Sequence, residues 1–157
     1  MSLEIERKFL IESNDYKDLS HKKSYIKQGF LNSNKYRTVR IRVIDEMGFI
    51  TIKGISNASG ISRYEWEKEI LLKEAEQLLL LCEKGVIEKN RYLIKHGRHI
   101  FEVDEFLNEN KGLIIAEIEL SNENELFQKP SWLGKEVTGN VKYYNSNLSK
   151  NPYADWV

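Results

Sequence analysis

Hydrophobic and polar residues alternate along most of the chain, and the stretch 36–44 shows this most clearly. In that stretch three aliphatic residues alternate with three polar ones, which are Thr38, Arg40 and Arg42. Successive side chains of a strand point to opposite faces, so this pattern predicts a strand with one aliphatic and one polar face. The same alternation predicts seven more strands, over 3–11, 24–31, 49–55, 62–70, 86–95, 100–106 and 113–120.

Turns and a change of period complete the predicted elements. The turn Asp45-Glu46-Met47-Gly48 is expected to place Gly48 at a positive φ, which makes a hairpin of the strands on either side. Apolar residues then recur at spacings of three and four over 72–84, with Gly85 after them, and this predicts one amphipathic helix. A short helical turn is expected within 14–20, and a last helix over 141–148.

The polar faces of the predicted strands carry mainly ionisable groups. Like charges two residues apart repel each other unless an opposite charge lies between them, so such pairs indicate a bound ligand or a partner side chain. The charged positions, strand by strand, are Glu4, Glu6 and Lys8; Arg40 and Arg42; Lys53; Arg63, Glu65 and Glu67; Lys89 and Arg91; Glu102 and Asp104; Glu117 and Glu119.

Two arrangements of these strands are consistent with the pattern. Eight short antiparallel strands can close into a barrel, which removes exposed edges and would enclose the charged faces around water, a metal ion and a polyanion. In that arrangement Glu4 and Glu6 hold a hard divalent cation and Lys8 meets a phosphate. The alternative is a β-sandwich or open sheet whose charged faces are solvated.

Composition restricts the function classes. The 157 residues carry 24 basic and 24 acidic side chains, so the zero net charge gives no reason to expect nucleic-acid or membrane binding. No window reaches the roughly 18 apolar residues of a membrane span. Cys82 is the single cysteine and is expected in the core as an unreactive thiol. We therefore expect one soluble, cytoplasmic domain over 1–157, and a homodimer is left open.

The ordered series of motifs resembles one known family. Glu4-Ile5-Glu6-Arg7-Lys8-Phe9-Leu10 is similar to the opening Glu-x-Glu-x-Lys signature of the CYTH domain, or triphosphate tunnel metalloenzymes. This family includes inorganic triphosphatases, thiamine triphosphatases and class IV adenylate cyclases. The later strands resemble the family in order as well, through Gln28-Gly29-Phe30-Leu31, Arg40-Ile41-Arg42, Thr51-Ile52-Lys53-Gly54, Arg63-Tyr64-Glu65-Trp66-Glu67, Lys89-Asn90-Arg91-Tyr92, Glu102-Val103-Asp104-Glu105-Phe106 and Ala116-Glu117-Ile118-Glu119-Leu120.

The resemblance implies a mainly β (α+β) fold: an eight-stranded antiparallel β-barrel that forms a charged tunnel, with peripheral helices. It also implies a set of site residues. Mg²⁺ or Mn²⁺ would be bound by Glu4, Glu6 and Glu119, with Asp104 and Glu117 nearby. Phosphate oxygens would be bound by Lys8, Arg40, Arg42, Lys53, Lys89 and Arg91, and the catalytic set would be Glu4, Glu6, Lys8 and Lys89. Pairing between strands explains Arg63, Glu65 and Glu67 as well as catalysis does.

The expected activity is metal-dependent hydrolysis of inorganic tripolyphosphate to pyrophosphate and phosphate. Thiamine triphosphate hydrolysis and cyclisation of ATP are alternatives, and so is a protein that binds polyphosphate or nucleotide without turnover. Phe30 stands where many small family members resemble Gln-Gly-Tyr-Leu. Its ring is expected either in the tunnel or under the helix 72–84, and the pattern does not decide between them.

Overall fold

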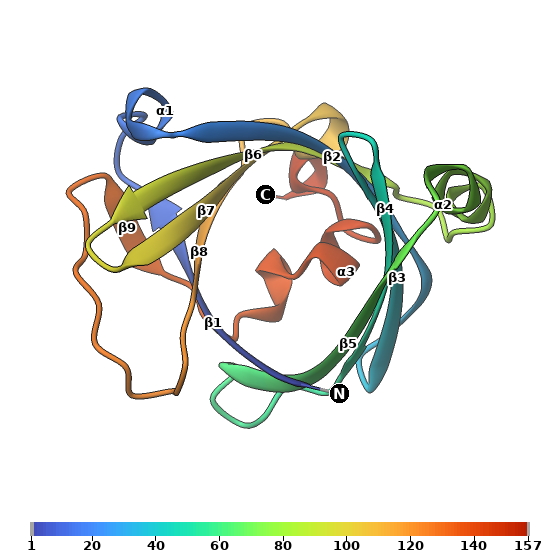
Figure 1. Cartoon of the computed structure of the whole chain (residues 1–157), viewed down its shortest axis with the longest axis horizontal. Coiled ribbons are helices and arrows are strands. Elements are labelled where there is room, and N and C mark those ends of the chain that lie inside the picture. The colour runs from blue at the N-terminus through green and yellow to red at the C-terminus, as the bar shows by residue number, and fades with distance from the viewer. Residues whose placement is uncertain (1, 157) are drawn as a thin grey trace.

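Eight strands pair edge to edge in a closed antiparallel barrel in the computed structural model, which describes residues 2–156 (Figure 1). The barrel closes because β1 pairs with both β5 and β8: Glu4 lies opposite Arg63, and Glu6 opposite Glu119. The predicted fold is confirmed. Around the barrel the strands are β1 (Ser2–Ile11), β5 (Ser62–Ile70), β4 (Met47–Gly54), β3 (Arg37–Ile44), β2 (Lys22–Asn34), β6 (Ile87–His96), β7 (His99–Phe106) and β8 (Ile114–Glu119).

A ninth strand was missed by the sequence analysis. β9 (Leu133–Glu136) pairs with the end of β1, where Glu136 lies opposite Phe9. Four residues are too few to show alternation, and the strand can be recognised only from its pairing with a segment more than a hundred positions away. β1 therefore has three neighbouring strands, two of which complete the barrel.

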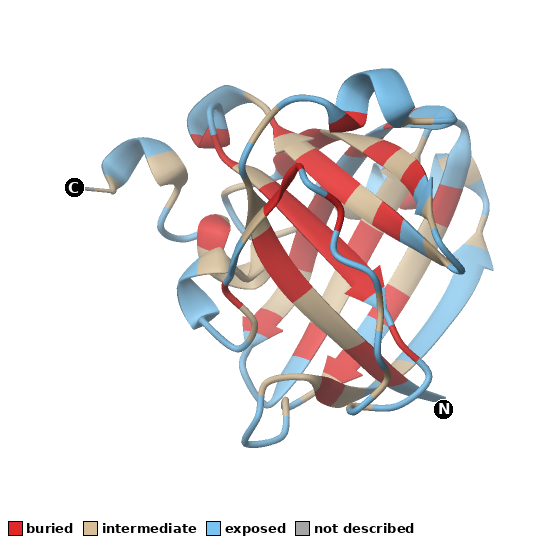
Figure 2. Cartoon of the chain, turned by 90° about the vertical axis from the view of Figure 1, so that its left-hand side faces the viewer, coloured by how far each residue is buried: buried red, intermediate tan, exposed pale blue. Residues whose placement is uncertain are grey.

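The main apolar core lies on the outer face of the barrel. Residues that alternate with the charged positions of β1, β7 and β8 point outward, among them Phe9, Phe101 and Ile118, which are all at most 1% exposed. They are covered by Tyr16 of α1 (Tyr16–Leu19) and by Trp132, whose ring lies 5.4 Å from that of Phe101. Figure 2 shows the buried residues running along the strands. The barrel interior is thus free to carry charge.

The helix α2 (Leu72–Leu79) packs on the outside of β3 and β4, at the right of Figure 1. It is shorter than the predicted 72–84, because residues 80–83 form turns that fold back onto β2 through a hydrogen bond from Glu83 N to Phe30 O. Cys82 lies in these turns and is only half-buried, so its expected place in the core is wrong. Its Cβ lies where a side chain on Gly29 would be, 2.9 Å from the position of the missing Cβ.

The β3–β4 hairpin is present, but Gly48 has a different role from the predicted one. The left-handed residue of the turn is Asp45, with φ of 52°, and Gly48 lies inside β4. A Cβ on Gly48 would come within 2.7 Å of the Ala75 Cβ of α2. This glycine is required for close packing of the helix on the strand rather than for the turn.

The C-terminal segment crosses one end of the barrel (Figures 1 and 2). It contains η2 (Val141–Tyr143), α3 (Asn145–Leu148) and η3 (Tyr153–Asp155), so the predicted helix over 141–148 is broken at Tyr144, which is extended. Leu148 packs against inward-facing apolar residues, among them Ile87 and Phe106, beside the short η1 (Asn108–Asn110). α1 and α2 are peripheral, whereas α3 closes the barrel end. Between residues 2 and 156 the structure contains no helix of the length and hydropathy required to cross a bilayer.

Candidate active site

The barrel encloses a cavity of about 220 Å³ that is lined by inward-facing residues of all eight barrel strands and by residues 144–146. The predicted site residues that line it are Glu4, Glu6, Lys8, Arg40, Arg42, Lys53, Arg63, Glu65, Glu67, Lys89, Arg91, Glu117 and Glu119. Seven of these thirteen side chains are basic and six are acidic, and Glu102 adds a seventh carboxylate. Basic and acidic side chains are therefore present in equal number within one enclosed space.

Glu4 is held by two cations from neighbouring strands. Its carboxylate lies 2.7 Å from Lys53 Nζ and 3.7 Å from Arg63 Nε. Burial alone would raise the pKa of Glu4, but the adjacent Lys53 ammonium and a hydrogen bond with Glu65 outweigh it and lower the pKa to about 2. Glu4 is thus ionised, and the Glu65 carboxyl beside it has a pKa raised to about 7 by burial and by that contact.

Glu6 and Glu117 form a second acidic group beside Lys8. The Lys8 Nζ lies 3.5 Å from Glu117 and 3.8 Å from Glu6. Burial and the Glu117 carboxylate raise the pKa of Glu6 to about 8. Lys8 and Arg91 lower the pKa of Glu117 despite its burial, so near neutral pH this pair of carboxyl groups carries about one negative charge.

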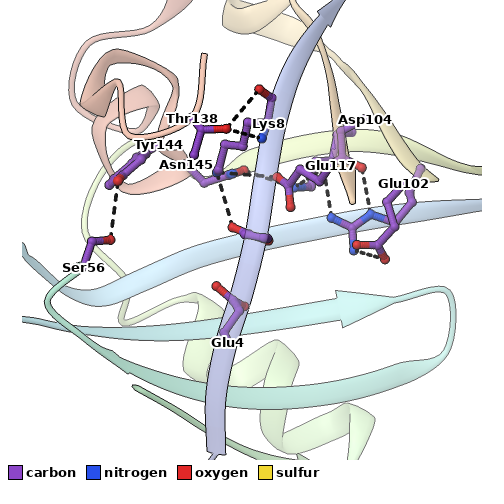
Figure 3. Close-up of polar contacts among 12 residues, drawn as sticks. Glu4, Lys8, Ser56, Glu102, Asp104, Glu117, Thr138, Tyr144 and Asn145 are labelled. Carbon is purple, nitrogen blue, oxygen red and sulfur yellow. Dashed lines mark hydrogen bonds and ion pairs between the residues drawn. The ribbon is translucent and has the colours of Figure 1, made fainter. Parts of the chain in front are cut away.

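Asp104 lies behind the cavity wall instead of lining it. It is 1% exposed and accepts hydrogen bonds from Arg91 at 2.7 and 2.9 Å, and Lys89 Nζ lies 2.7 Å from it (Figure 3). Burial lowers the pKa of Lys89 to about 8 although Asp104 opposes the shift. Asp104 therefore fixes the two phosphate-binding candidates in place. Both of its oxygens are engaged by these cations, which fits the supporting acid that was predicted and not a direct metal ligand.

The guanidinium groups of Arg40 and Arg42 on β3 each have a hydrogen-bond donor without an acceptor in the described part of the chain. Within residues 2–156 the Nε atoms of Arg40 and Arg42 are buried and have no acceptor. The Nη2 atoms of both lie 3.6 Å from Glu67, and Arg40 also donates to Thr51 Oγ1 at 3.2 Å. Burial together with the neighbouring Arg40 lowers the pKa of Arg42 to about 9. Unpaired buried donors are costly, so this wall favours binding of an anion.

Comparison with known proteins identifies the family of this chain. The family model for the CYTH domain matches residues 2–152. This chain belongs to the CYTH domain family. An "Inorganic triphosphatase" of Acetivibrio thermocellus is 50% identical over 157 residues, which cover 99% of both chains, and one of Nitrosomonas europaea is 32% identical over 93% of this chain and 96% of the relative.

Solved structures share this fold. A crystal structure described as an inorganic triphosphatase superposes with a TM-score of 0.65, at 29% identity, over 95% of each chain. A Hippeastrum protein described as a putative adenylyl cyclase with a dominant triphosphatase activity has a TM-score of 0.59 at 16% identity, over 78% of this chain and 80% of its own. The second likeness shows the fold alone.

The carboxylates of this CYTH domain fit a hard divalent cation by their chemistry. Burial and the neighbouring carboxylates of Glu4 and Glu117 raise the pKa values of Glu6 and Glu119, and a cation among these groups would relieve the repulsion. No cluster of three acidic, histidine or cysteine side chains is gathered closely enough to form a ready-made metal site within the described part of the chain. The carboxylates are therefore of the right kind to bind a divalent cation. Glu4 is paired with Lys53 in this structure, however, and would have to release Lys53 before it could bind the cation.

Several cavity residues were not predicted as part of the site. Alternation had placed Thr38 and Glu102 on polar strand faces, and Thr51 shares the face of Lys53, but none of the three was predicted to bind metal or substrate. Phe30 also lines the cavity, which places its ring in the tunnel and not under α2. Asn145 accepts hydrogen bonds from Gln28 Nε2 at 3.0 Å and from Lys89 Nζ at 3.1 Å. Both partners are far away in the sequence, so no local sequence pattern could have predicted these contacts.

Proposed function

We propose that this protein is a divalent-cation-dependent hydrolase that cleaves inorganic tripolyphosphate to pyrophosphate and phosphate. One observation carries the proposal: seven cations from five strands and seven carboxylates face one enclosed cavity, in which buried donors of Arg40 and Arg42 lack acceptors. A tripolyphosphate supplies the missing acceptors along its length. The two relatives named inorganic triphosphatases support the choice of substrate.

The basic residues would bind and orient the substrate. Arginine guanidinium groups present several donors in a fixed plane that suits phosphate oxygens, so Arg40, Arg42 and Arg91 would hold the chain by hydrogen bonds. Lys8, Lys53 and Lys89 add compact charges along the same cavity. Phosphoryl transfer gains most of its rate from positioning and from neutralising charge on the transferred group, which this wall of cations supplies without a covalent nucleophile.

The acidic residues would hold Mg²⁺ or Mn²⁺ through Glu4, Glu6 and Glu119, with Glu117 beside them. Bound there, the cation would supply Lewis-acid stabilisation of phosphoryl oxygens. Glu4 would release Lys53, which then becomes free to bind phosphate in its place. Asp104 keeps Lys89 and Arg91 oriented toward the cavity.

The cellular location that we propose is the cytoplasm, where a protein with a single unpaired cysteine is ordinary.

Release of phosphate from purified protein tests this proposal. Tripolyphosphate, thiamine triphosphate and ATP would each be supplied with Mg²⁺ or Mn²⁺, and a chelator provides the metal-free control. We expect metal-dependent turnover with the highest kcat/KM for tripolyphosphate. A higher value for thiamine triphosphate or ATP would assign an organic substrate. Saturable binding of tripolyphosphate without any turnover would instead identify a binding protein and overturn the proposal.

A further inference from the structure

Three inward-facing residues on neighbouring strands form one row across the barrel wall. In the register of the sheet, Thr51 of β4 lies opposite Arg40 of β3 on one side and opposite Glu67 of β5 on the other. Thr51 lines the tunnel and is 1% exposed. Its hydroxyl group is therefore buried between a basic and an acidic side chain.

The hydroxyl group of Thr51 is hydrogen-bonded to both neighbours. It accepts a hydrogen bond from Arg40 Nη2 at 3.2 Å and donates one to Glu67 Oε2 at 2.7 Å. A guanidinium group can only donate and a carboxylate can only accept, so the single proton of the hydroxyl is directed to Glu67. Among residues 2–156 this is the only hydrogen bond that the Glu67 carboxylate accepts. Thr51 therefore fixes the position of Glu67 Oε2.

Two guanidinium groups approach the same oxygen of Glu67 without bonding to it. The Nη2 atoms of Arg40 and Arg42 each lie 3.6 Å from Glu67 Oε2, whereas a charge-assisted hydrogen bond measures about 2.7–2.9 Å. The Nε atoms of both arginines are buried and have no acceptor in the described part of the chain. Glu67 is thus close enough to offset the two charges, but it leaves donors available to a ligand.

Arg91 shows how a carboxylate engages a guanidinium group in this barrel when the two meet directly. Its Nε and Nη2 atoms donate to the two oxygens of Asp104 at 2.7 and 2.9 Å, and Nη1 donates to Glu102 at 3.1 Å. Three of the five N–H groups of Arg91 are therefore already used. A similar approach of Glu67 to Arg40 and Arg42 would occupy donors that a phosphate needs.

We propose that Thr51 is a positioning residue for tripolyphosphate binding. Its hydroxyl group holds the Glu67 carboxylate away from Arg40 and Arg42 and so keeps their donors available to phosphate oxygens. This inference rests on the proposed triphosphatase function. Carboxylate and phosphate oxygens compete for the same guanidinium donors. The side chain of Glu67 is 31% exposed, so it has room to turn toward the arginines once the hydrogen bond from Thr51 is removed.

Replacement of the hydroxyl group by a methyl group tests this role at nearly constant volume. Thr51→Val should raise the KM for tripolyphosphate by about tenfold and change kcat by about twofold or less, because the arginines contribute binding common to the ground state and the transition state. Thr51→Ser keeps the hydroxyl group and should stay within about threefold of the parent in both constants. Initial rates of phosphate release with saturating Mg²⁺ give these values. A loss in Thr51→Ser as large as in Thr51→Val would contradict the role of the hydroxyl group.

The charge of Glu67 separates this role from a merely structural one. In the Glu67→Gln background no carboxylate is present to capture the arginines, so the addition of Thr51→Val should change KM by less than about twofold. If Thr51 served only to support Arg40 or the packing of β4, the increase in KM would be equal in both backgrounds. That result would overturn the inference.

Thermal melting and calorimetry separate the remaining outcomes. Each variant would be required to melt cooperatively, and Thr51→Ala replaces Thr51→Val if the latter fails to fold. A parent-like KM in the folded variant overturns the inference. If the parent does not hydrolyse tripolyphosphate, the proposed function itself is wrong. Dissociation constants for tripolyphosphate then test the positioning role: Thr51→Val should weaken binding about tenfold when Glu67 is present and less than about twofold in the Glu67→Gln background.

Discussion

The inner and outer faces of the same strands bury side chains of opposite character: charged on the inner face and apolar on the outer face. On β7, Glu102 and Asp104 face inward and contact cations, whereas Phe101 and Val103 face outward and are fully buried in the apolar core. The outer face gains hydrophobic free energy from this packing. The inner face buries charges, which costs desolvation and is offset only in part by ion pairs. Stability is thus concentrated outside the barrel, and binding capacity inside it.

This division predicts that substitutions on the two faces have different consequences. Inner substitutions should change activity and leave the fold intact, and outer substitutions should change stability and leave the activity of the folded protein intact. The following four experiments test the division, two on each face.

Glu6→Gln should have the largest effect. Loss of one carboxylate ligand removes several kcal/mol of charge stabilisation, or roughly a thousandfold in rate. The melting temperature without metal should not fall, because Glu6 is buried beside Glu117 with a raised pKa and the neutral amide resembles its protonated form. Phosphate release and thermal melting measure the two quantities. Turnover at the parent rate with Mg²⁺ would contradict the metal assignment.

Phe101→Ala should destabilise the protein by about 3–5 kcal/mol, because it leaves a cavity in the outer core. The ring is fully buried and contacts those of Trp132 and Phe127, with centroids 5.4 and 6.1 Å away. Urea unfolding gives the free energy, and kcat should be measured at a temperature where the variant is folded. A large loss of kcat in folded Phe101→Ala would break the division between the faces.

Arg40→Ala should weaken tripolyphosphate binding by about 2 kcal/mol, the usual contribution of a hydrogen bond to a charged group. Tripolyphosphate binds the native state and should raise the melting temperature of the parent, and this shift should shrink in the variant. Without ligand the variant should melt close to the parent, because loss of the unpaired buried Nε of Arg40 offsets loss of its hydrogen bond to Thr51, and Glu67 keeps its contact with Arg42. Lys73→Gln on α2 is the control, and an equal shift in all three proteins would exclude phosphate binding at Arg40.

Arg7→Gln should have the smallest effect. Arg7 faces outward and pairs with Glu136 of β9 at 2.6 and 2.8 Å, a partly exposed pair worth about 1 kcal/mol or less. The hydrogen bond from Arg7 lowers the pKa of Glu136, so this stability is present above the unfolded pKa of about 4.3 and is lost as the pH falls through the lower folded value.

Urea unfolding of both proteins at several pH values checks this prediction. The difference in unfolding free energy between the parent and Arg7→Gln should be constant near neutral pH and vanish in acid. A difference that grows as the pH falls would show that another group dominates the effect of the substitution.

Local patterns predicted the faces of the strands well and the contacts between them poorly. Alternation placed Glu4, Glu6 and Lys8 on one face, and the structure agrees because that period is a property of the strand itself. The pairing of Glu4 with Lys53 depends on how strands far apart in sequence meet, which no local pattern contains. Asp104 shows the same limit: alternation placed it on the inner face, but its contacts with Lys89 and Arg91 were not predicted.

The C-terminal segment was the least predictable region for a related reason. Its apolar residues suggested one helix over 141–148, yet Tyr144 is extended between two short helical turns. Asn145 is turned inward by contacts with Gln28 and Lys89, which lie 117 and 56 positions away. Tertiary contacts therefore override local propensity where the segment closes the barrel.

The three neighbours of β1 have a consequence for the order in which the chain is synthesised. β1 is translated before the strands it pairs with: Ile5 pairs with Ser62, and Phe9 pairs with both Ala116 and Glu136. The metal-binding candidates on β1 therefore cannot reach their final positions until strands much later in the sequence have been translated. Closure of the barrel is thus a late step of folding that joins segments far apart in the sequence. We expect nascent chains released before β8 to lack the enclosed cavity and to expose apolar outer faces, which makes them substrates for chaperones.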